Sequence, residues 1–412
     1  MNIQTFTLPC GLRVIHERSG LPVLYCGYVV CAGTRHEEPQ DTGMAHFIEH
    51  MSFKGTGKRR ACHITNGLER VGGDLNAYTT KQETVYYATV LREDFARAAD
   101  LLTDIVFHST YPQREADKEI EVICDEIESY NDSPAELIFD EFEAMMYPGQ
   151  PLGRDILGTP DRLRQYRTAD ALRFARRWYQ PSNAVFYVYG DVHFDRVLRV
   201  LEKLLPAAAP MMKTSGAGRI GMDKPHPFCG RQERIVKKDT HQTHVLMGAP
   251  TFAGTDERRF ALALLNNMLA GPGMNSRLNV AMRERAGLVY SVDSYINTYP
   301  DTGFWNVYFG CDGHDVSLCR HRVERELRRF IENPLTPAQL AAAKKQLIGQ
   351  TVISATSAEG YALSLGKTYA HYGRHYDVAS LCAAVREVSA EELCRVAAQV
   401  YAPESLTTLI YT

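Results

Sequence analysis

The stretch from Gly43 to Met51 places two histidines and a glutamate about one helical turn apart. At about 100° per residue, His46 and His50 fall within about 40° of each other on one helix face. Two neutral imidazoles placed in this way can hold a single zinc ion. Glu49 lies about 60° to the other side of His46, where a carboxylate can take a proton from water whose pKa the zinc has lowered. The stretch therefore predicts a helix that carries part of a metal site.

The residues around this stretch favour a helix. Asp41 or Thr42 is expected to cap its N-terminus, and Gly55 is expected to end it. The spacing His-x-x-Glu-His is the inverted form of the His-Glu-x-x-His zinc motif. The chain contains 14 histidines, so two exposed histidines at this spacing by chance are the alternative for the motif taken alone.

A third ligand is expected on another helix, between Gln113 and Ser129. In this segment Glu119, Val122, Ile123 and Glu126 occupy positions i, i+3, i+4 and i+7, so they form one stripe along the helix. Carboxylates in line with core positions are costly to bury unless a cation meets them. For this segment alone, the alternative is an ordinary charged helix whose carboxylates are all solvated.

Taken together, these residues resemble the motif set of the M16 zinc peptidases, the family of pitrilysin, insulin-degrading enzyme and the mitochondrial processing peptidase. Glu126 follows His50 by 76 residues, as the family pattern requires. The resemblance, to a short-chain bacterial-type member, implies zinc held by His46, His50 and Glu126. It also implies Glu49 as the catalytic general base and Glu119 as a second carboxylate that orients the site.

A change of composition divides the chain near its middle. Residues 206–232 are rich in proline, glycine and alanine, which is typical of a linker. We therefore predict an N-terminal zinc-binding catalytic domain over 1–207, a linker over 208–232, and a C-terminal domain over 233–412. The secondary structure expected along the chain comprises strands at 5–18, 22–33, 74–80, 84–90, 183–190 and 244–250, and helices at 64–71, 92–107, 113–129 and 260–269, with mostly helical structure from 134.

The second half repeats the layout of the first but lacks the metal residues. A shift of 217 residues places Ala263, Asn266 and Asn267 opposite His46, Glu49 and His50, in that order. A shift of 225 residues places Lys344 opposite Glu119 and Thr351 opposite Glu126. Paired domains of this kind also build M16 chains. The expected fold class is therefore α+β: two homologous α/β-sandwich domains, each an antiparallel-rich sheet packed with helices, of the LuxS and mitochondrial processing peptidase type.

Two further residue sets gain meaning from the family resemblance. Arg283 and Tyr290, seven residues apart in the second half, match an Arg-Tyr pair that binds substrate near the scissile bond in M16 proteins. Without the resemblance they are most simply packing and surface residues. Asn76 and Ala77 match a strand that offers its edge to a peptide, a form of main-chain recognition. The alternative is an ordinary hairpin strand.

Composition excludes several classes of partner. The net charge of −3 gives no electrostatic footprint for nucleic acid or an acidic membrane. No signal peptide is visible, and no apolar run approaches the about 18 residues of a membrane span. The ten cysteines occur singly, which favours reduced thiols. We therefore expect a cytoplasmic protein without nucleic-acid or membrane partners.

The sequence as a whole predicts a zinc metalloendopeptidase that acts on peptides or unfolded segments. Long single-chain relatives close four domains around a chamber, so a chain with two domains is expected to form a homodimer, or a heterodimer with an M16 relative. The main alternative is a non-catalytic structural or assembly subunit of an M16-like complex. Such relatives usually lose motif residues, and this chain has kept them. A zinc hydrolase of non-peptide substrates is a third possibility, which the Asn76 strand argues against.

Overall fold

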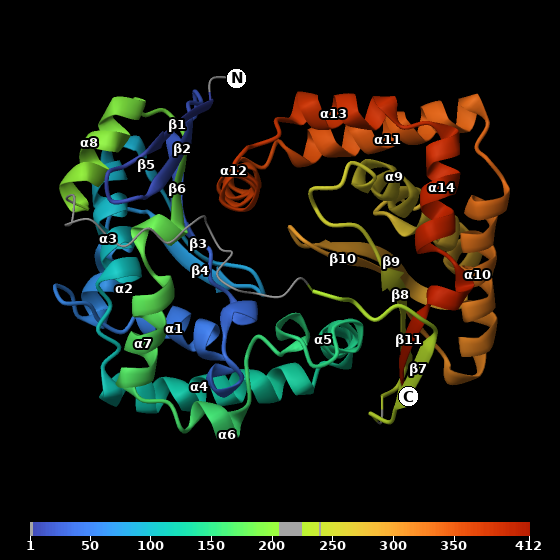
Figure 1. The fold of residues 1–412 in the computed structure, drawn as a ribbon, viewed down its shortest axis with the longest axis horizontal. Helices are drawn as coiled ribbons and strands as arrows, with labels where there is room; N and C mark the ends of the chain where they lie inside the picture. Colours follow the sequence, from blue (N-terminus) through green and yellow to red (C-terminus); the bar gives the residue numbers. More distant parts are fainter. Residues whose placement is uncertain (1–2, 206–224, 239) are drawn as a thin grey trace. The chain divides into compact units, whose positions relative to one another are not determined.

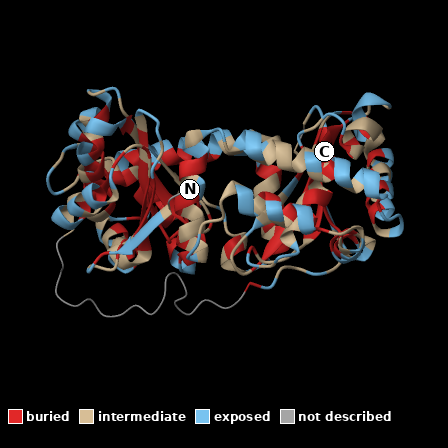
Figure 2. Ribbon diagram, turned by 90° about the horizontal axis from the view of Figure 1, so that it is seen from above, coloured by how far each residue is buried: buried red, intermediate tan, exposed pale blue. Residues whose placement is uncertain are grey.

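The structure, a computed structural model, describes residues 3–205, 225–238 and 240–412. These residues form two compact units, and each consists of a β-sheet packed against helices (Figure 1). The α+β class with two sheet-and-helix domains is therefore confirmed. In both units the central strands are largely buried, whereas strands at the sheet edges are more exposed and the helices have one exposed side (Figure 2).

The first unit contains a six-stranded sheet in the order β1-β2-β6-β3-β5-β4. Neighbouring strands are antiparallel except β2 and β6, which are parallel. Strand β4 forms one edge of this sheet and pairs only with β5. The strands are β1 (Ile3–Thr7), β2 (Arg13–Glu17), β3 (Val23–Val30), β4 (Asp74–Thr79), β5 (Thr84–Leu91) and β6 (Ala184–Tyr189).

Helices cover both faces of this sheet, which explains why its central strands are apolar along their whole length. Alternate residues of β3, such as Leu24 and Tyr28, belong to the core on one face. Val29 belongs to the core on the other face, where α12 (Ala358–Tyr372) packs through Ala362 and Leu365. The helices on the first face are α1 (Met44–Ser52), α2 (Ala61–Glu69), α3 (Phe95–Phe107), α4 (Gln113–Asn131), α6 (Pro160–Leu163), α7 (Thr168–Trp178) and α8 (Phe194–Leu204).

The second unit repeats this plan with a five-stranded sheet in the order β7-β11-β8-β10-β9. Helix α5 (Pro134–Met146) packs on one face through residues such as Phe142, against Leu246 and Leu409. The remaining helices cover the other face, around the buried Trp305. The strands are β7 (Gln232–Val236), β8 (Thr243–Pro250), β9 (Val289–Thr298), β10 (Gly303–Cys311) and β11 (Thr407–Tyr411), and the helices on the second face are α9 (Arg259–Ala270), α10 (Val316–Glu332), α11 (Pro337–Ser354), α13 (Val378–Glu387) and α14 (Ala390–Val400).

The two units are interleaved along the sequence. The first takes its described residues from Met1–Glu128, Arg154–Met222 and Ala355–His375, and the second takes Ser129–Gly153, Asp223–Ser354 and Tyr376–Thr412. This partition differs from the contiguous domains expected over 1–207 and 233–412, because α5 and α12 each pack in the unit formed mainly by the other half of the chain. Most of the linker expected over 208–232 lies outside the described residues.

Most of the elements expected from the sequence are found with small shifts. The hairpin of β4 and β5 and the helices α2, α3, α4 and α9 lie where they were predicted. The strand expected over 5–18 is instead two antiparallel strands, β1 and β2. They are separated by a turn in which Gly11 has a φ of 89°, a left-handed conformation that favours glycine.

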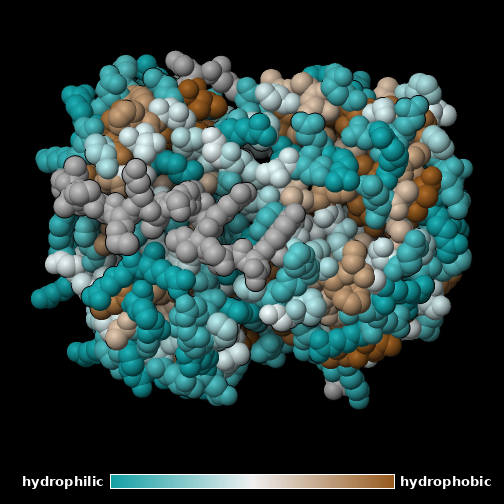
Figure 3. Space-filling view, in the orientation of Figure 1, coloured by the Kyte–Doolittle hydropathy of each residue, from teal (hydrophilic) through white to brown (hydrophobic). Residues whose placement is uncertain are grey.

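The surface carries no sign of a membrane-spanning segment among the described residues. Every described helix is either too short or too polar to cross a bilayer. On the face drawn in Figure 3, hydrophilic side chains predominate and hydrophobic ones occur in separate small patches.

Close packing of α12 on the first sheet generates a prediction. An added Cβ at Gly366 would lie 2.4 Å from Cδ1 of Tyr187. We expect Gly366→Ala to lower the free energy of unfolding by about 1–3 kcal/mol, because overpacking forces neighbours apart. The control is Gly349→Ala in α11, where a Cβ meets nothing within 4 Å and alanine should stabilise the helix by up to about 1 kcal/mol. Urea denaturation followed by circular dichroism measures both. Equal effects would contradict the close contact.

Candidate metal site

The motif helix α1 begins in a way that differs from the prediction. Its N-terminal residue is preceded by Gly43, with a φ of 87°, and neither Asp41 nor Thr42 caps it. Instead, the carboxylate of Glu37 accepts hydrogen bonds from the backbone N–H groups of Gly43 at 2.9 Å and Ala45 at 2.8 Å. Burial raises the pKa of Glu37 to about 8, although these two donors act in the opposite direction. A cap this far upstream depends on the loop that precedes the helix, so local sequence pattern does not reveal it.

Helices α1 and α4 bring the three predicted ligands together. The Nε2 atoms of His46 and His50 lie 3.9 Å and 3.6 Å from Oε2 of Glu126. One ligand atom from each of these residues lies within 4.8 Å of the others, which is the clustering a metal ion needs. His46 is almost fully buried, whereas the Glu126 side chain is 43% exposed. The cluster is therefore open to solvent on the side of Glu126.

Glu49 lies beside this cluster and is held by a residue that the sequence did not indicate. Its Oε2 accepts a hydrogen bond of 2.7 Å from the hydroxyl of Thr79, the last residue of β4. Burial raises the pKa of Glu49 above its ordinary value. The signal for Thr79 was weak, because a hydroxyl at the end of a predicted strand is common and acquires its role only through the packing of β4 against α1.

Glu119 bonds to the far side of one histidine. Its Oε1 lies 3.0 Å from Nδ1 of His50, and its Oε2 lies 2.6 Å from the ammonium group of Lys54. This ion pair fixes the carboxylate between two positive or hydrogen-bonding groups, and it leaves Nε2 of His50 directed to Glu126. Lys54 was not predicted as part of the site. Its spacing of four residues from His50, within a helix expected to run up to Gly55, was the available signal. In the structure Lys54 lies just beyond the end of α1 at Ser52.

The protonation of the two histidines reflects these neighbours. Burial, and to a smaller extent the neighbouring His50, lower the pKa of His46 to about 3, so its ring is neutral. Burial opposes a charge on His50, but its hydrogen bond to Glu119 and the carboxylates of Glu49 and Glu126 outweigh burial and raise its pKa. Three carboxylates converge on two imidazoles, and this arrangement favours a cation between them.

Strand β4, which carries Asn76 and Ala77, runs beside α1 at the edge of the first sheet. Asn76 is exposed, and its side-chain oxygen accepts a hydrogen bond of 2.9 Å from the N–H of Ala77. The edge strand thus has a backbone donor that is engaged by a side chain.

Arg283 and Tyr290 lie in the second unit, and both are exposed, Tyr290 to 81%. Arg283 belongs to the π-helical turn η6 (Asn279–Glu284), and Tyr290 is the second residue of the edge strand β9. Between them, Gly287 with a φ of 60° reverses the chain, and its N–H donates to the carbonyl of Arg283 at 3.0 Å.

Three of the repeat positions in the second unit, Asn266, Lys344 and Thr351, make structural contacts. The side-chain oxygen of Asn266 accepts a hydrogen bond from the indole of the buried Trp305 at 3.1 Å. Lys344 bonds to the carbonyl of Arg386, and Thr351 bonds back to the carbonyl of Leu347. Among the described residues, the second unit has no cluster of metal-ligating side chains at this place.

Comparison with known families agrees with this description. Residues 13–160 match the family described as Insulinase (Peptidase family M16), and residues 167–347 match the Peptidase M16 inactive domain. An uncharacterized zinc protease of Streptomyces coelicolor is 35% identical, over 97% of this chain and 87% of that protein. The uncharacterized zinc protease YmxG of Bacillus subtilis is 31% identical, over 99% of this chain and 98% of that protein.

Solved structures show the same fold. A protease from Helicobacter pylori superposes with a TM-score of 0.92 at 20% sequence identity, over 100% of this chain and 99% of that chain. A Pseudomonas fluorescens protein described as a peptidase M16 inactive domain gives a TM-score of 0.88 at 17% identity. The family models and the two relatives at 35% and 31% identity show that the chain belongs to the M16 peptidase family.

Proposed function

We propose that the chain is a zinc-dependent endopeptidase in which His46, His50 and Glu126 hold the metal. The observation that carries this proposal is the convergence of these three side chains, within 4.8 Å of one another, beside the buried carboxylate of Glu49. Two imidazoles and one carboxylate form a zinc ligand set that leaves a coordination position for substrate or water. The neutral ring of His46 suits this role, because a metal ligand must be deprotonated.

The residues around the ligands have separate tasks in this proposal. Bound zinc would polarise a carbonyl oxygen and lower the pKa of water. Glu49 accepts a proton from the attacking water and returns it to the leaving amine, and its raised pKa suits a group that must do both. The hydroxyl of Thr79 keeps one carboxylate oxygen of Glu49 in place. Glu119 holds the ring of His50 in one orientation and is itself held by Lys54.

Substrate recognition would begin at the edge of the first sheet. A peptide that adds to β4 as an extra strand can accept the hydrogen bond that the N–H of Ala77 now gives to its neighbour. The side chain of Asn76, once displaced, becomes available to a substrate carbonyl. Because such binding uses the main chain, it favours peptides and unfolded segments over folded proteins.

The non-catalytic alternative has no feature of its own to support it. The relatives with the highest identity quoted above are named zinc proteases, although they are uncharacterized. All the motif residues are present in this chain. A structural subunit would have no need of a carboxylate such as Glu49 held beside two histidines.

Replacing the proposed base tests the function. We expect Glu49→Gln to retain zinc and to lower the cleavage of a quenched peptide library by about 10²–10⁴-fold, because the amide cannot take up a proton. Zinc content is measured in the same samples. The control is Glu128→Gln, an exposed carboxylate on α4, which should keep full activity. Equal activity of Glu49→Gln and the wild type, with zinc bound, would remove Glu49 from the mechanism.

The two carboxylates of α4 should differ in their effect on zinc affinity. Glu126→Gln removes a ligand and should abolish tight binding. Glu119→Gln should weaken binding by about 10–100-fold, the usual cost of losing a group that orients a ligand. Competition with a chromophoric chelator measures both affinities. A larger loss for Glu119→Gln than for Glu126→Gln would show that the two roles have been exchanged.

We further propose that the chain acts as a homodimer with shared sites, each zinc cluster facing Arg283 and Tyr290 of the other copy. A guanidinium and a phenol are suitable donors to a peptide carbonyl that becomes an oxyanion. Their exposure in this structure is compatible with a role towards a partner. Two copies arranged head to tail would supply four domains around one chamber.

Mixing two inactive variants tests this arrangement. Glu49→Gln and Arg283→Ala are refolded separately and together. In a mixed dimer with shared sites, one site combines an intact Glu49 with an intact Arg283, so activity should return in part. If Arg283 serves its own chain, both sites stay defective. Activity of the mixture equal to the sum of the separate variants therefore contradicts the shared-site proposal.

A further inference from the structure

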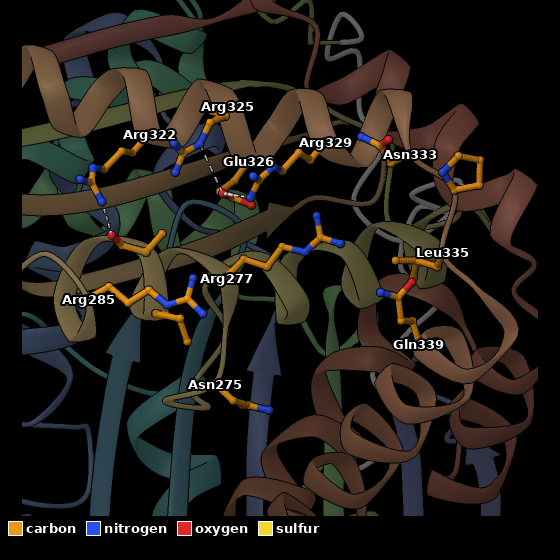
Figure 4. A pocket seen from close by; sticks show the side chains of 13 residues that line it. Asn275, Arg277, Arg285, Arg322, Arg325, Glu326, Arg329, Asn333, Leu335 and Gln339 are labelled. Atoms are coloured by element: carbon orange, nitrogen blue, oxygen red, sulfur yellow. Dashed lines mark hydrogen bonds and ion pairs between the residues drawn. The ribbon is translucent and has the colours of Figure 1, made fainter.

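A pocket lined by arginines lies within the second unit, far along the chain from the metal ligands. It is an open pocket of about 830 Å³, lined by α10, η6, the residues that precede η6 and the segment from Asn333 to Gln339. In Figure 4, Arg322, Arg325 and Arg329 extend from α10 towards Arg277 and Arg285 on the facing segment. The spacing of the three arginines on α10, at i, i+3 and i+7, puts them on one side of that helix.

The charges in this pocket are unbalanced. Glu326 is the one carboxylate among the lining residues, and its Oε1 lies 2.7 Å from Arg329 and 3.7 Å from Arg325. Arg322 donates to the carbonyl of Ala281 at 2.5 Å. Five guanidinium groups thus face a single negative charge.

Two of these guanidinium groups, Arg277 and Arg285, form no ion pair with a described residue, although the charge of Glu326 acts on Arg277 from a distance. The guanidinium carbon of Arg277 lies 3.8 Å from the centre of the Phe330 ring. Burial lowers the pKa of Arg277. Neither Arg277 nor Arg285 makes a side-chain hydrogen bond or ion pair among the described residues. Arg277 is half-buried, where a guanidinium without a paired carboxylate is unfavourable, whereas Arg285 is exposed. The pocket is therefore ready to receive an anion.

A second pocket of about 770 Å³ continues from the first along α9 and α11. The two share Asn275, Arg277, Leu335 and Gln339. The second pocket is lined mainly by neutral amides and small apolar side chains, with Lys345 as a further cation. Three of its lining residues contain buried polar atoms without a hydrogen-bond partner in the part of the chain that the structure describes: Nδ2 of Asn267, Oγ of Ser276 and Oε1 of Gln350.

The chemistry of the two pockets together restricts the ligand. Guanidinium groups pair with carboxylates or phosphates. The neutral half, however, is lined by amide side chains such as Gln339 and Gln346, each of which carries both a donor and an acceptor. An oligophosphate carries acceptors only, whereas a peptide main chain carries N–H and C=O groups in alternation. A peptide with a cluster of carboxylates therefore matches both halves of the groove.

We infer that this arginine-and-amide groove of the second unit binds peptides through an acidic segment, with carboxylates among Arg277, Arg285 and Arg325 and neutral main chain along α9 and α11. The inference rests on the proposed function, because a peptidase is expected to meet such peptides. It adds a second recognition site, with a charge preference, to the main-chain recognition proposed for β4.

Direct binding to a catalytically silenced chain tests the inference. The probe is a fluorescein-labelled peptide with a run of glutamates at one end and a neutral glycine-serine-leucine segment at the other. Its matched control has glutamine in place of each glutamate. Binding is measured by fluorescence anisotropy on the full chain carrying Glu49→Gln, so the probe stays intact and the result does not depend on whether the chain cleaves peptides.

The variant Arg285→Gln with Arg325→Gln removes two pocket cations and leaves the Arg329–Glu326 pair in place. We expect it to bind the acidic probe at least about tenfold more weakly, since hydrogen bonds between charged groups are among the stronger ones. The matched control, Arg320→Gln with Arg328→Gln, makes the same charge change on α10 outside the pocket, where these residues pair with Glu233 and Glu324. It should bind as the parent does. The double lysine variant, Arg285→Lys with Arg325→Lys, should recover part of the affinity.

Several outcomes overturn the inference. The first is equal affinity for the acidic and the glutamine probes. The second is an equal loss of affinity in the pocket variant and the control variant. The third is a pocket variant that is unfolded by circular dichroism, together with a folded lysine variant whose affinity for the acidic probe is no higher. Tighter binding of inorganic triphosphate than of the acidic probe, abolished by the pocket variant, would assign the groove to phosphate ligands instead.

Discussion

The contact between helices α1 and α4 determines the geometry of the metal site. Each helix contributes core residues to the same apolar cluster, among them Phe47 and Ile123. This arrangement brings two carboxylates of α4 to the histidines: Glu119 bonds to His50, and Glu126 approaches both rings. Apolar burial provides the free energy that holds three carboxylates close together, a grouping that would be unfavourable without a cation.

The sequence contained the parts of the site that depend on helical spacing. His46, Glu49 and His50 are fixed relative to one another by one helix, and so are Glu119 and Glu126 by another, so their periodicity could be read directly. Glu37, Lys54 and Thr79 were missed. Glu37 and Thr79 act across contacts between different elements, and such contacts leave no periodic signal. The position of Lys54 four residues after His50 could have indicated its role, but surface lysines at that spacing from a histidine are common.

The same distinction applies to the fold. Strand and helix types followed from the patterns of apolar residues, and the repeated layout of the two halves predicted two similar sheets. Which sheet each amphipathic helix covers did not follow. The apolar stripe of α5 fits any flat apolar face, and only the tertiary structure shows that it packs against Leu246 and Leu409, not against the sheet formed by its own half of the chain.

The exchange of α5 and α12 has a consequence for how the chain is made. During synthesis from the N-terminus, the first sheet is complete once β6 has emerged, yet the face formed by Val29, Val185 and Tyr187 stays uncovered until α12 follows some 170 residues later. An exposed apolar sheet face is prone to misassembly. The first unit therefore cannot reach its final form on the ribosome until most of the second unit has been synthesised.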